Sequence, residues 1–332
     1  MRYHRVLTTT IRTVVRAALL LWCVLSLTFA LLHLAPGDPA IFLLPPTASA
    51  DDAGRLRAEL GLDRPLAAQY ARWLGTTLRG DLGASFAERR PVRAVLADAL
   101  PVSLALGGVS LLVSFLVGVA MGLVQSARRG TRIDNVLTTA SVLMVASPAY
   151  WLGLGAIALF TYLASSWSLP LFVRLPAIGM TTPGVELHGV RWMADVVRHS
   201  ILPVSLLSAI GAGGVARYVR AGALDLAQAD WMRTARAKGL SRVAAYRRHL
   251  LPNLRGALLT LVSLALPGTV AGSVFVETIF GWPGMGRLMV TAIVGRDHPV
   301  VLGCATLFAA IVIVANLLAE ALLPWADPRV RS

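Results

Sequence analysis

The chain has 332 residues, of which 56% are hydrophobic and only 14% are charged, and its mean hydropathy is +0.68. Soluble globular domains carry about a quarter charged residues, so this composition excludes an ordinary soluble protein and indicates one with several membrane spans. The net charge of +14 does not indicate nucleic-acid binding, because the basic residues gather in alternate segments between apolar runs.

The first predicted transmembrane helix is the apolar run at residues 17–34. A cleavable signal peptide is the alternative, but the run is long for one and lacks a convincing small-residue cleavage site. The arginines before it predict a cytoplasmic N-terminus. Residues 1–35 are therefore expected to form a cytoplasmic tail and the first span.

Residues 36–98 form a polar segment that we expect outside the membrane. Two prolines and a glycine at 35–40 end the first helix, and Asp38 there is interpreted as a turn or capping residue. Amphipathic spacing predicts helices at 51–60 and 65–78. One face of the second is expected to carry Leu66, Tyr70, Trp73 and Leu74. The segment is either a platform for a soluble partner or a packing cap over the spans.

Residues 99–323 are expected to hold five further spans, and residues 324–332 a cytoplasmic tail. The expected spans are residues 99–127, 135–165, 200–218, 256–276 and 299–319. Pro148 is expected to bend the third span. Irregular outer loops are expected at 174–199 and 277–298. The fold class is therefore all-α, with six transmembrane helices, both termini inside and a helical insertion outside between the first two spans.

Glycines in two of these spans predict close helix packing, because residues three or four apart share one helix face and glycine lets two backbones approach in lipid. They are Gly107, Gly108, Gly118 and Gly122 in the second span, and Gly211, Gly213 and Gly214 in the fourth. Cys23 and Cys304 lie in apolar runs and are interpreted as small core residues, so no disulfide or metal site is expected.

The most informative stretch is the strongly basic loop at residues 221–255, between the fourth and fifth spans. Residues 226–238 are good helix formers, and Gly239 can take the left-handed conformation that ends a helix. Ser241 can cap a second short helix, and Pro252 marks the start of the fifth span. The pattern predicts a helix, a sharp turn and a second helix against the cytoplasmic membrane face.

This loop resembles the cytoplasmic loop of ABC-importer permeases, in which E-A-A, three residues and Gly precede a Leu-Pro. Ala235, Gly239, Leu251 and Pro252 fall on that motif, whereas Arg233, Thr234 and His249 depart from it. The version D-W-M-R-T-A-R-A-K-G-L-S is similar to that of the dipeptide/oligopeptide/nickel subfamily. So are L-H-L-A-P-G-D-P-A, E-L-G-L-D-R-P-L-A-A-Q-Y, G-D-L-G-A-S-F, V-E-T-I-F-G-W-P-G-M-G-R-L and A-D-P-R-V, in the subfamily's order.

The resemblance implies a type I importer permease in the bacterial plasma membrane, with a paralogous second permease, two ATPase subunits and an extracytoplasmic substrate-binding protein as partners. It implies that the loop docks on the ATPase through Asp230, Trp231, Thr234, Ala235, Arg236, Ala237, Lys238, Gly239, Leu240, Leu251 and Pro252. Helical spacing places Trp231, Ala235 and Lys238 on one contact face. Ala235→Glu is accordingly expected to break docking without unfolding the spans.

No cofactor is expected on this chain. Its only lysine, Lys238, is not part of a phosphate-binding G-x-x-x-x-G-K-[ST] motif, so ATP and Mg²⁺ are assigned to the partner ATPase subunits. No catalytic residue is expected either, because H-E-x-x-H and G-x-S-x-G motifs are absent.

Glu277, Trp282 and Arg287 are candidate substrate or gate residues in the outer motif after the fifth span. The alternative for Glu277 is a satisfied carboxylate at a conformational hinge, since membrane carboxylates are costly. Short peptides are the solute that the resemblance favours. A nickel chelate, glutathione or another small solute stays open. A stand-alone secondary transporter is disfavoured, because the second, third and fifth spans contain no Asp, Glu, His or Arg.

Overall fold

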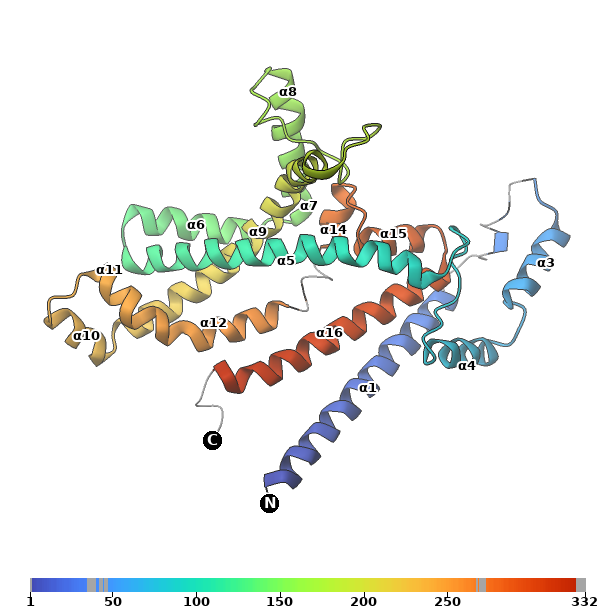
Figure 1. Ribbon diagram of the computed structural model, residues 1–332, viewed down its shortest axis with the longest axis horizontal. Helices are drawn as coiled ribbons and strands as arrows, with labels where there is room; N and C mark the ends of the chain where they lie inside the picture. Colours follow the sequence, from blue (N-terminus) through green and yellow to red (C-terminus); the bar gives the residue numbers. More distant parts are fainter. Residues whose placement is uncertain are drawn as a thin grey trace. The chain divides into compact units, whose positions relative to one another are not determined.

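The computed structural model describes residues 2–34, 40–41, 44, 47–266, 268 and 273–326, and these are helical apart from turns and one isolated β-bridge (Figure 1). Within these residues, five helices are long and apolar enough to cross a membrane. They span Val15–Leu34, Val92–Ala127, Ala149–Ser166, Gly189–Ala227 and His298–Leu318. The all-helical class is confirmed. The predicted turn at 35–39 and residues 327–332 of the predicted tail lie outside the described residues.

Contacts divide the chain into two units, which are described separately. The first comprises residues 1–101 and 287–313, and the second comprises 102–286 and 314–332. This division follows packing, whereas the boundaries expected at residues 35, 98 and 323 follow the membrane surface. Those boundaries stay a prediction.

The first unit contains two short helices that the sequence predicts to within a residue, α3 (Ala50–Leu60) and α4 (Leu66–Thr77). Ser49 caps α3 and forms a reciprocal capping box with Asp52, which satisfies amide groups that a helix start leaves unpaired. Gly61, with φ of 68°, ends α3 in the left-handed conformation.

Helix α4 lies beside the end of α1 (Arg2–Leu34) in the first unit (Figure 1). Aromatic side chains join the two helices. The Phe29 ring lies 5.3 Å from that of Tyr70 and 5.4 Å from that of Trp73, between ring centres. The Tyr70 hydroxyl also lies 2.6 Å from the Ser26 hydroxyl. The predicted apolar face of α4 is confirmed at Tyr70 and Trp73, but Leu66 at its start is exposed.

The second unit is organised by α5 (Val92–Ala127) and α9 (Gly189–Ala227), which pack through glycines. A methyl group on Gly118 would lie 2.6 Å from Val215 Cβ, and one on Gly122 would lie 2.6 Å from the Ala216 carbonyl oxygen. The prediction of close packing is therefore confirmed at both positions.

The other predicted packing glycines have mixed outcomes. Gly211 lies against Ser114, and a methyl group on Gly213 would lie 2.8 Å from the Ser141 carbonyl oxygen, so both are confirmed. No atom of the described residues lies within 4 Å of a methyl group added at Gly108 or Gly214, so close packing within the described part of the chain is not found there.

The predicted third span at 135–165 is not one helix. It divides into α6 (Arg132–Ala146) and α7 (Ala149–Ile157), and α7 continues through a π-helical turn, η1 (Ala158–Leu163), into α8 (Ala164–Ser166). Proline disfavours a helical conformation in the residue before it. Ser147, which precedes Pro148, is accordingly extended, with φ of −76° and ψ of 134°.

An ion pair joins α6 to the inner part of α9. The Arg220 guanidinium donates two 2.9 Å hydrogen bonds, from Nε and Nη2, to the two carboxylate oxygens of Asp134. These bonds lower the pKa of Asp134 to about 2. The side chain of Asp134 is 3% exposed, so the paired guanidinium is what allows a charged carboxylate there.

Two predicted outer loops are more helical than the sequence indicated. Helix α9 begins at Gly189, within the loop expected at 174–199, and runs for 39 residues with Pro203 inside it. The segment at 277–298 contains the end of α14 (Val274–Ile279) and all of α15 (Met285–Val294). Glycine and proline thus mark only the turn between α14 and α15.

The predicted fifth span begins in α12 (Leu251–Ala265). Residues 267 and 269–272 lie outside the described residues, so this crossing stays a prediction. The predicted sixth span corresponds to the apolar part of α16 (His298–Ala326).

Candidate functional site

The 221–255 loop forms as the sequence predicts, from short helices at the inner end of α9. Helix α10 (Asp230–Ala237) follows α9 after a two-residue turn, and Gly239 then reverses the chain with φ of 81°. The Ser241 hydroxyl accepts a hydrogen bond from the amide of Ala244 and so caps α11 (Arg242–Ala245). A π-helical turn, η2 (Tyr246–Leu250), leads into α12, and Pro252 stands in the first turn of that helix.

A buried apolar cluster fixes this loop to the long helices on either side. Met232, Tyr246 and Leu250 pack with Val219 of α9 and Leu254 of α12. Met232 and Leu250 are completely buried. Each such side chain contributes about 1.5–3 kcal/mol when it leaves water. The loop is therefore a rigid extension of α9 and α12, able to pass a displacement to both.

The same burial corrects one part of the predicted contact face. Ala235 is only 5% exposed, on the inward side of α10 with Met232, whereas Trp231 and Lys238 are exposed. Ala235→Glu would therefore place a carboxylate in the packed interior of the loop, so we expect it to disturb the loop itself as well as docking. Met232 and Ala235 are three residues apart and so lie on one side of a helix, and this spacing could have indicated that α10 has an apolar side facing the protein.

The remaining predicted docking residues differ in exposure. Asp230, Trp231, Thr234, Arg236, Ala237, Lys238 and Gly239 are exposed, and Leu240, Leu251 and Pro252 are half-buried. The exposed surface of α10 is thus polar and mainly basic, opposite an apolar inward face. This is the surface that α10 offers to another protein.

One anchor of the loop was not predicted. The guanidinium of Arg242 donates a hydrogen bond to the carbonyl oxygen of Ala127, the last residue of α5. The bond satisfies one of the carbonyl groups that a helix end leaves unpaired, and it connects the loop to a third long helix. No local sequence pattern signals this contact, because 115 residues separate the two partners.

The Glu277 carboxylate lies in a closed hydrogen-bonded cluster in the second unit. Its Oε1 accepts hydrogen bonds from the hydroxyls of Ser103, at 2.7 Å, and Ser273, at 2.6 Å. Its Oε2 accepts one from the amide of Gly286 at 2.7 Å. The Ser103 hydroxyl in turn accepts from the amide of Met285, so the cluster holds the start of α15.

The three candidate gate residues differ in burial. Glu277 has 0% exposure and Trp282 has 4%, and both lie in the second unit. Arg287 is exposed and belongs to the first unit. The structure thus favours the satisfied-carboxylate interpretation of Glu277. Among the described residues no group of three or more His, Cys, Asp or Glu side chains is placed to hold a metal ion.

Two family models match this chain. Residues 114–332 match the family described as binding-protein-dependent transport system inner membrane component. Residues 6–107 match the N-terminal part of such membrane components.

Two relatives extend over nearly the whole chain. A Brucella suis (biovar 1, strain 1330) protein whose name describes a peptide permease is 33% identical over 308 residues, covering 92% of this chain and 93% of that protein. The oligopeptide transport system permease protein AppB of Bacillus subtilis (strain 168) is 33% identical over 305 residues, covering 92% of this chain and 93% of AppB.

A solved structure shows the fold. It is described as an inward-facing conformation of the MetNI methionine ABC transporter, and it superposes with a TM-score of 0.53 at 17% identity. The match covers 71% of this chain and 97% of that one. The chain therefore belongs to the family of binding-protein-dependent transport system inner membrane components: it is a multi-pass, non-catalytic permease subunit of a bacterial ABC importer, carries no cofactor, and relies on a separate subunit for ATP hydrolysis.

Proposed function

We propose that this permease forms half of a translocation path for short peptides, which an extracytoplasmic binding protein delivers to it. The names of its relatives support peptides as the solute: both AppB and the Brucella suis protein are named for peptide or oligopeptide transport. A paralogous second permease forms the other half of the path, and two ATPase subunits lie beneath them.

The proposed topology has six spans with both termini in the cytoplasm. The distribution of arginine supports it, since Arg128, Arg129 and Arg132 and the basic 221–255 loop lie at one end of their helices. Residues 36–98 then lie outside. Membership of an importer family leaves no support for a stand-alone secondary transporter.

One observation carries the proposed mechanism: the 221–255 loop has a buried apolar face rooted in α9 and α12 and an exposed basic face on α10. We infer that the exposed face of α10 docks on the ATPase. Movement of the ATPase subunits would displace α10, and the packed cluster around Met232 would pass the displacement to α9 and α12 without deforming.

Arg236→Glu is expected to reduce ATP-driven transport by about tenfold or more, because a reversed charge at a docking surface costs about 1.4 kcal/mol or more. Arg236 is exposed on α10, so the substitution leaves the buried cluster intact. Co-purification of the ATPase with the permease and peptide uptake by the reconstituted complex would measure the loss.

Arg129→Glu is the matched control. Arg129 is also exposed and the proposed topology places it on the same side of the membrane, but it lies in the turn between α5 and α6. The control is expected to retain the ATPase. Docking through α10 would be contradicted if both variants lose the ATPase and peptide uptake equally, or if Arg236→Glu loses neither.

A further inference from the structure

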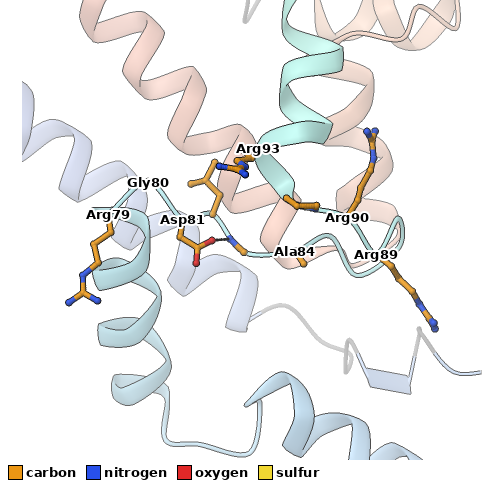
Figure 2. A pocket seen from close by; sticks show the side chains of 10 residues that line it. Arg79, Gly80, Asp81, Ala84, Arg89, Arg90 and Arg93 are labelled. Atoms are coloured by element: carbon orange, nitrogen blue, oxygen red, sulfur yellow. Dashed lines mark hydrogen bonds between the residues drawn. The ribbon is translucent and has the colours of Figure 1, made fainter.

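An arginine-rich surface surrounds the loop that connects α4 to α5 in the first unit (Figure 2). The loop encloses a cleft of about 480 Å³. Its lining includes Arg79, Arg89, Arg90 and Arg93, with Asp81 as the one acidic side chain. The proposed topology places this loop outside the membrane, where the positive-inside rule gives no reason for such a cluster.

The loop is rigid rather than a mobile connection. The amide of Ser85 donates to the Arg90 carbonyl oxygen at 2.9 Å, and the amide of Val92 donates to the Gly83 carbonyl oxygen at 3.0 Å. The buried carboxylate of Asp297 accepts hydrogen bonds from the Ser85 hydroxyl at 2.5 Å and the Ala87 amide at 3.1 Å. A surface held in this way loses little entropy when it binds a partner.

The backbone at Arg89 is strained. Its φ is 53°, a left-handed conformation that residues other than glycine and asparagine rarely adopt. A hydrogen bond from its own amide to the Ser85 carbonyl oxygen stabilises this geometry. Such strain often occurs at functional positions, and here its effect is to hold an exposed arginine at the tip of the loop.

Three of the four arginines have no acidic partner among the described residues. Arg90 forms ion pairs of 2.6 Å with both Glu88 and Asp98, which neutralise it. The side chains of Arg79, Arg89 and Arg93 are exposed and form no hydrogen bond or ion pair within the described part of the chain. The carboxylate of Asp81 accepts a hydrogen bond from the amide of Gly83 instead.

The directions of these side chains indicate the size of the partner. Figure 2 shows Arg79 and Arg89 extending away from the loop on opposite sides, with Arg93 between them in this view. Guanidinium groups that hold one small anion converge on it, whereas these three are spread across a surface. The arrangement therefore suits an extended acidic surface rather than a single carboxylate or phosphate.

The length of α5 argues against lipid headgroups as that acidic surface. Its 36 residues span about 54 Å, whereas a bilayer with its headgroups is about 40–45 Å thick. With Ala127 at the cytoplasmic face, the outer end of α5 extends about 10 Å beyond the outer headgroups. Arg93 and the loop attached to it then lie in water, within reach of a soluble protein.

We propose that Arg79, Arg89 and Arg93 form the docking surface for an acidic face of the extracytoplasmic binding protein on which this importer family depends. The inference rests on the proposed topology. Arginines spread over a rigid loop would attract the binding protein from solution and orient its acidic face before solute is released.

The test measures the affinity of the fluorescently labelled binding protein of this transport system for the complete importer in nanodiscs. Arg93→Glu and Arg79→Glu are each expected to raise the dissociation constant about tenfold. The wild-type affinity should fall with added salt, and that of the Arg79→Glu/Arg93→Glu double variant should depend on salt much less. Arg93→Lys, which keeps the charge, should retain most of the affinity.

Arg55→Glu is the matched control, because Arg55 is an exposed arginine of the same outer segment, on α3 and away from the cleft. It should bind as the wild type does. Basal ATPase activity equal to that of the wild type shows that a variant complex is assembled. If Arg93→Glu lacks this activity, the neutral variant Arg93→Gln takes its place.

The outcomes separate this inference from the proposed function. Wild-type affinity in Arg79→Glu and Arg93→Glu, or an equal loss in Arg55→Glu, would overturn the docking surface and leave the importer intact. A wild-type complex that does not bind the protein would overturn both. If the substitutions weaken binding in phosphatidylglycerol discs but not in phosphatidylcholine discs, the arginines contact lipid headgroups and the inference is overturned.

Discussion

Gly122→Val is expected to prevent stable assembly of the permease. A Cβ atom at this position would lie 2.6 Å from the Ala216 carbonyl oxygen and 2.7 Å from Val219 Cβ. Neither neighbour can move freely, because one belongs to the backbone of α9 and the other is a buried branched side chain. The two helices would have to separate along the centre of the second unit. Overpacking of this kind costs about 1–3 kcal/mol or more.

Gly108→Val provides the matched comparison on the same helix. No described atom lies within 4 Å of a Cβ atom added at Gly108, so the substitution has the same effect on helix propensity without a steric clash. The yield of intact complex and the thermal midpoint in detergent should fall strongly for Gly122→Val and little for Gly108→Val. Similar midpoints for the two variants would show that α5 and α9 do not pack through Gly122.

Glu277→Ala is expected to have the second large effect. It removes the shared acceptor of three buried donors: the hydroxyls of Ser103 and Ser273 and the amide of Gly286. Each buried donor left without an acceptor costs about 1–3 kcal/mol. We therefore expect a loss of about 3 kcal/mol or more and a loose connection between α14 and α15.

Two variants distinguish this structural role from a role in binding solute. Glu277→Gln keeps one carbonyl oxygen as an acceptor and should lose less stability than Glu277→Ala. Thr278→Ala changes the exposed neighbour on α14 and should behave as the wild type. If Glu277→Ala keeps the thermal midpoint but loses uptake of one class of solute, Glu277 is a substrate residue and the structural account is wrong.

The sequence predicts the elements of this fold better than their limits, because local signals act over a few residues. Gly239 and Ser241 are placed correctly, since a left-handed turn and a helix cap depend only on neighbouring backbone atoms. Pro148 was expected to bend a helix, but α6 ends before it, because a proline disfavours the helical conformation in the preceding residue, here Ser147.

The orientation of α10 shows what periodicity alone does not provide. The helical repeat places Trp231, Ala235 and Lys238 near one another around the helix axis. It does not determine which side of the helix packs against the rest of the protein. That depends on the apolar surface of α9 and α12, which the loop reaches only in the folded chain. Ala235 lies three residues after Met232, on the same side of α10. Because that side is the one that packs against the protein, with Met232 completely buried, Ala235 is buried too.

Long-range polar contacts were the least predictable part of the candidate sites. The partners of Glu277 include Ser103, which is 174 residues away, and those of Asp297 include Ser85, which is 212 residues away. No local pattern pairs such residues, and only the packing of distant helices brings them together. For the same reason the sequence does not predict the hydrogen-bonded frame that holds the loop between α4 and α5.

The central claim is that this permease carries short peptides through an ATP-driven importer. Its most direct test is uptake by the complex of this chain, its partner permease, the ATPases and the binding protein, reconstituted in vesicles. Vesicles receive a pool of short peptides, glutathione and nickel salts, with and without ATP, and their contents are identified by mass spectrometry. We predict that short peptides accumulate only with ATP. Accumulation of nickel or glutathione without peptides would contradict the assignment of peptides as the solute. Peptide accumulation without ATP would contradict the ATP-driven mechanism.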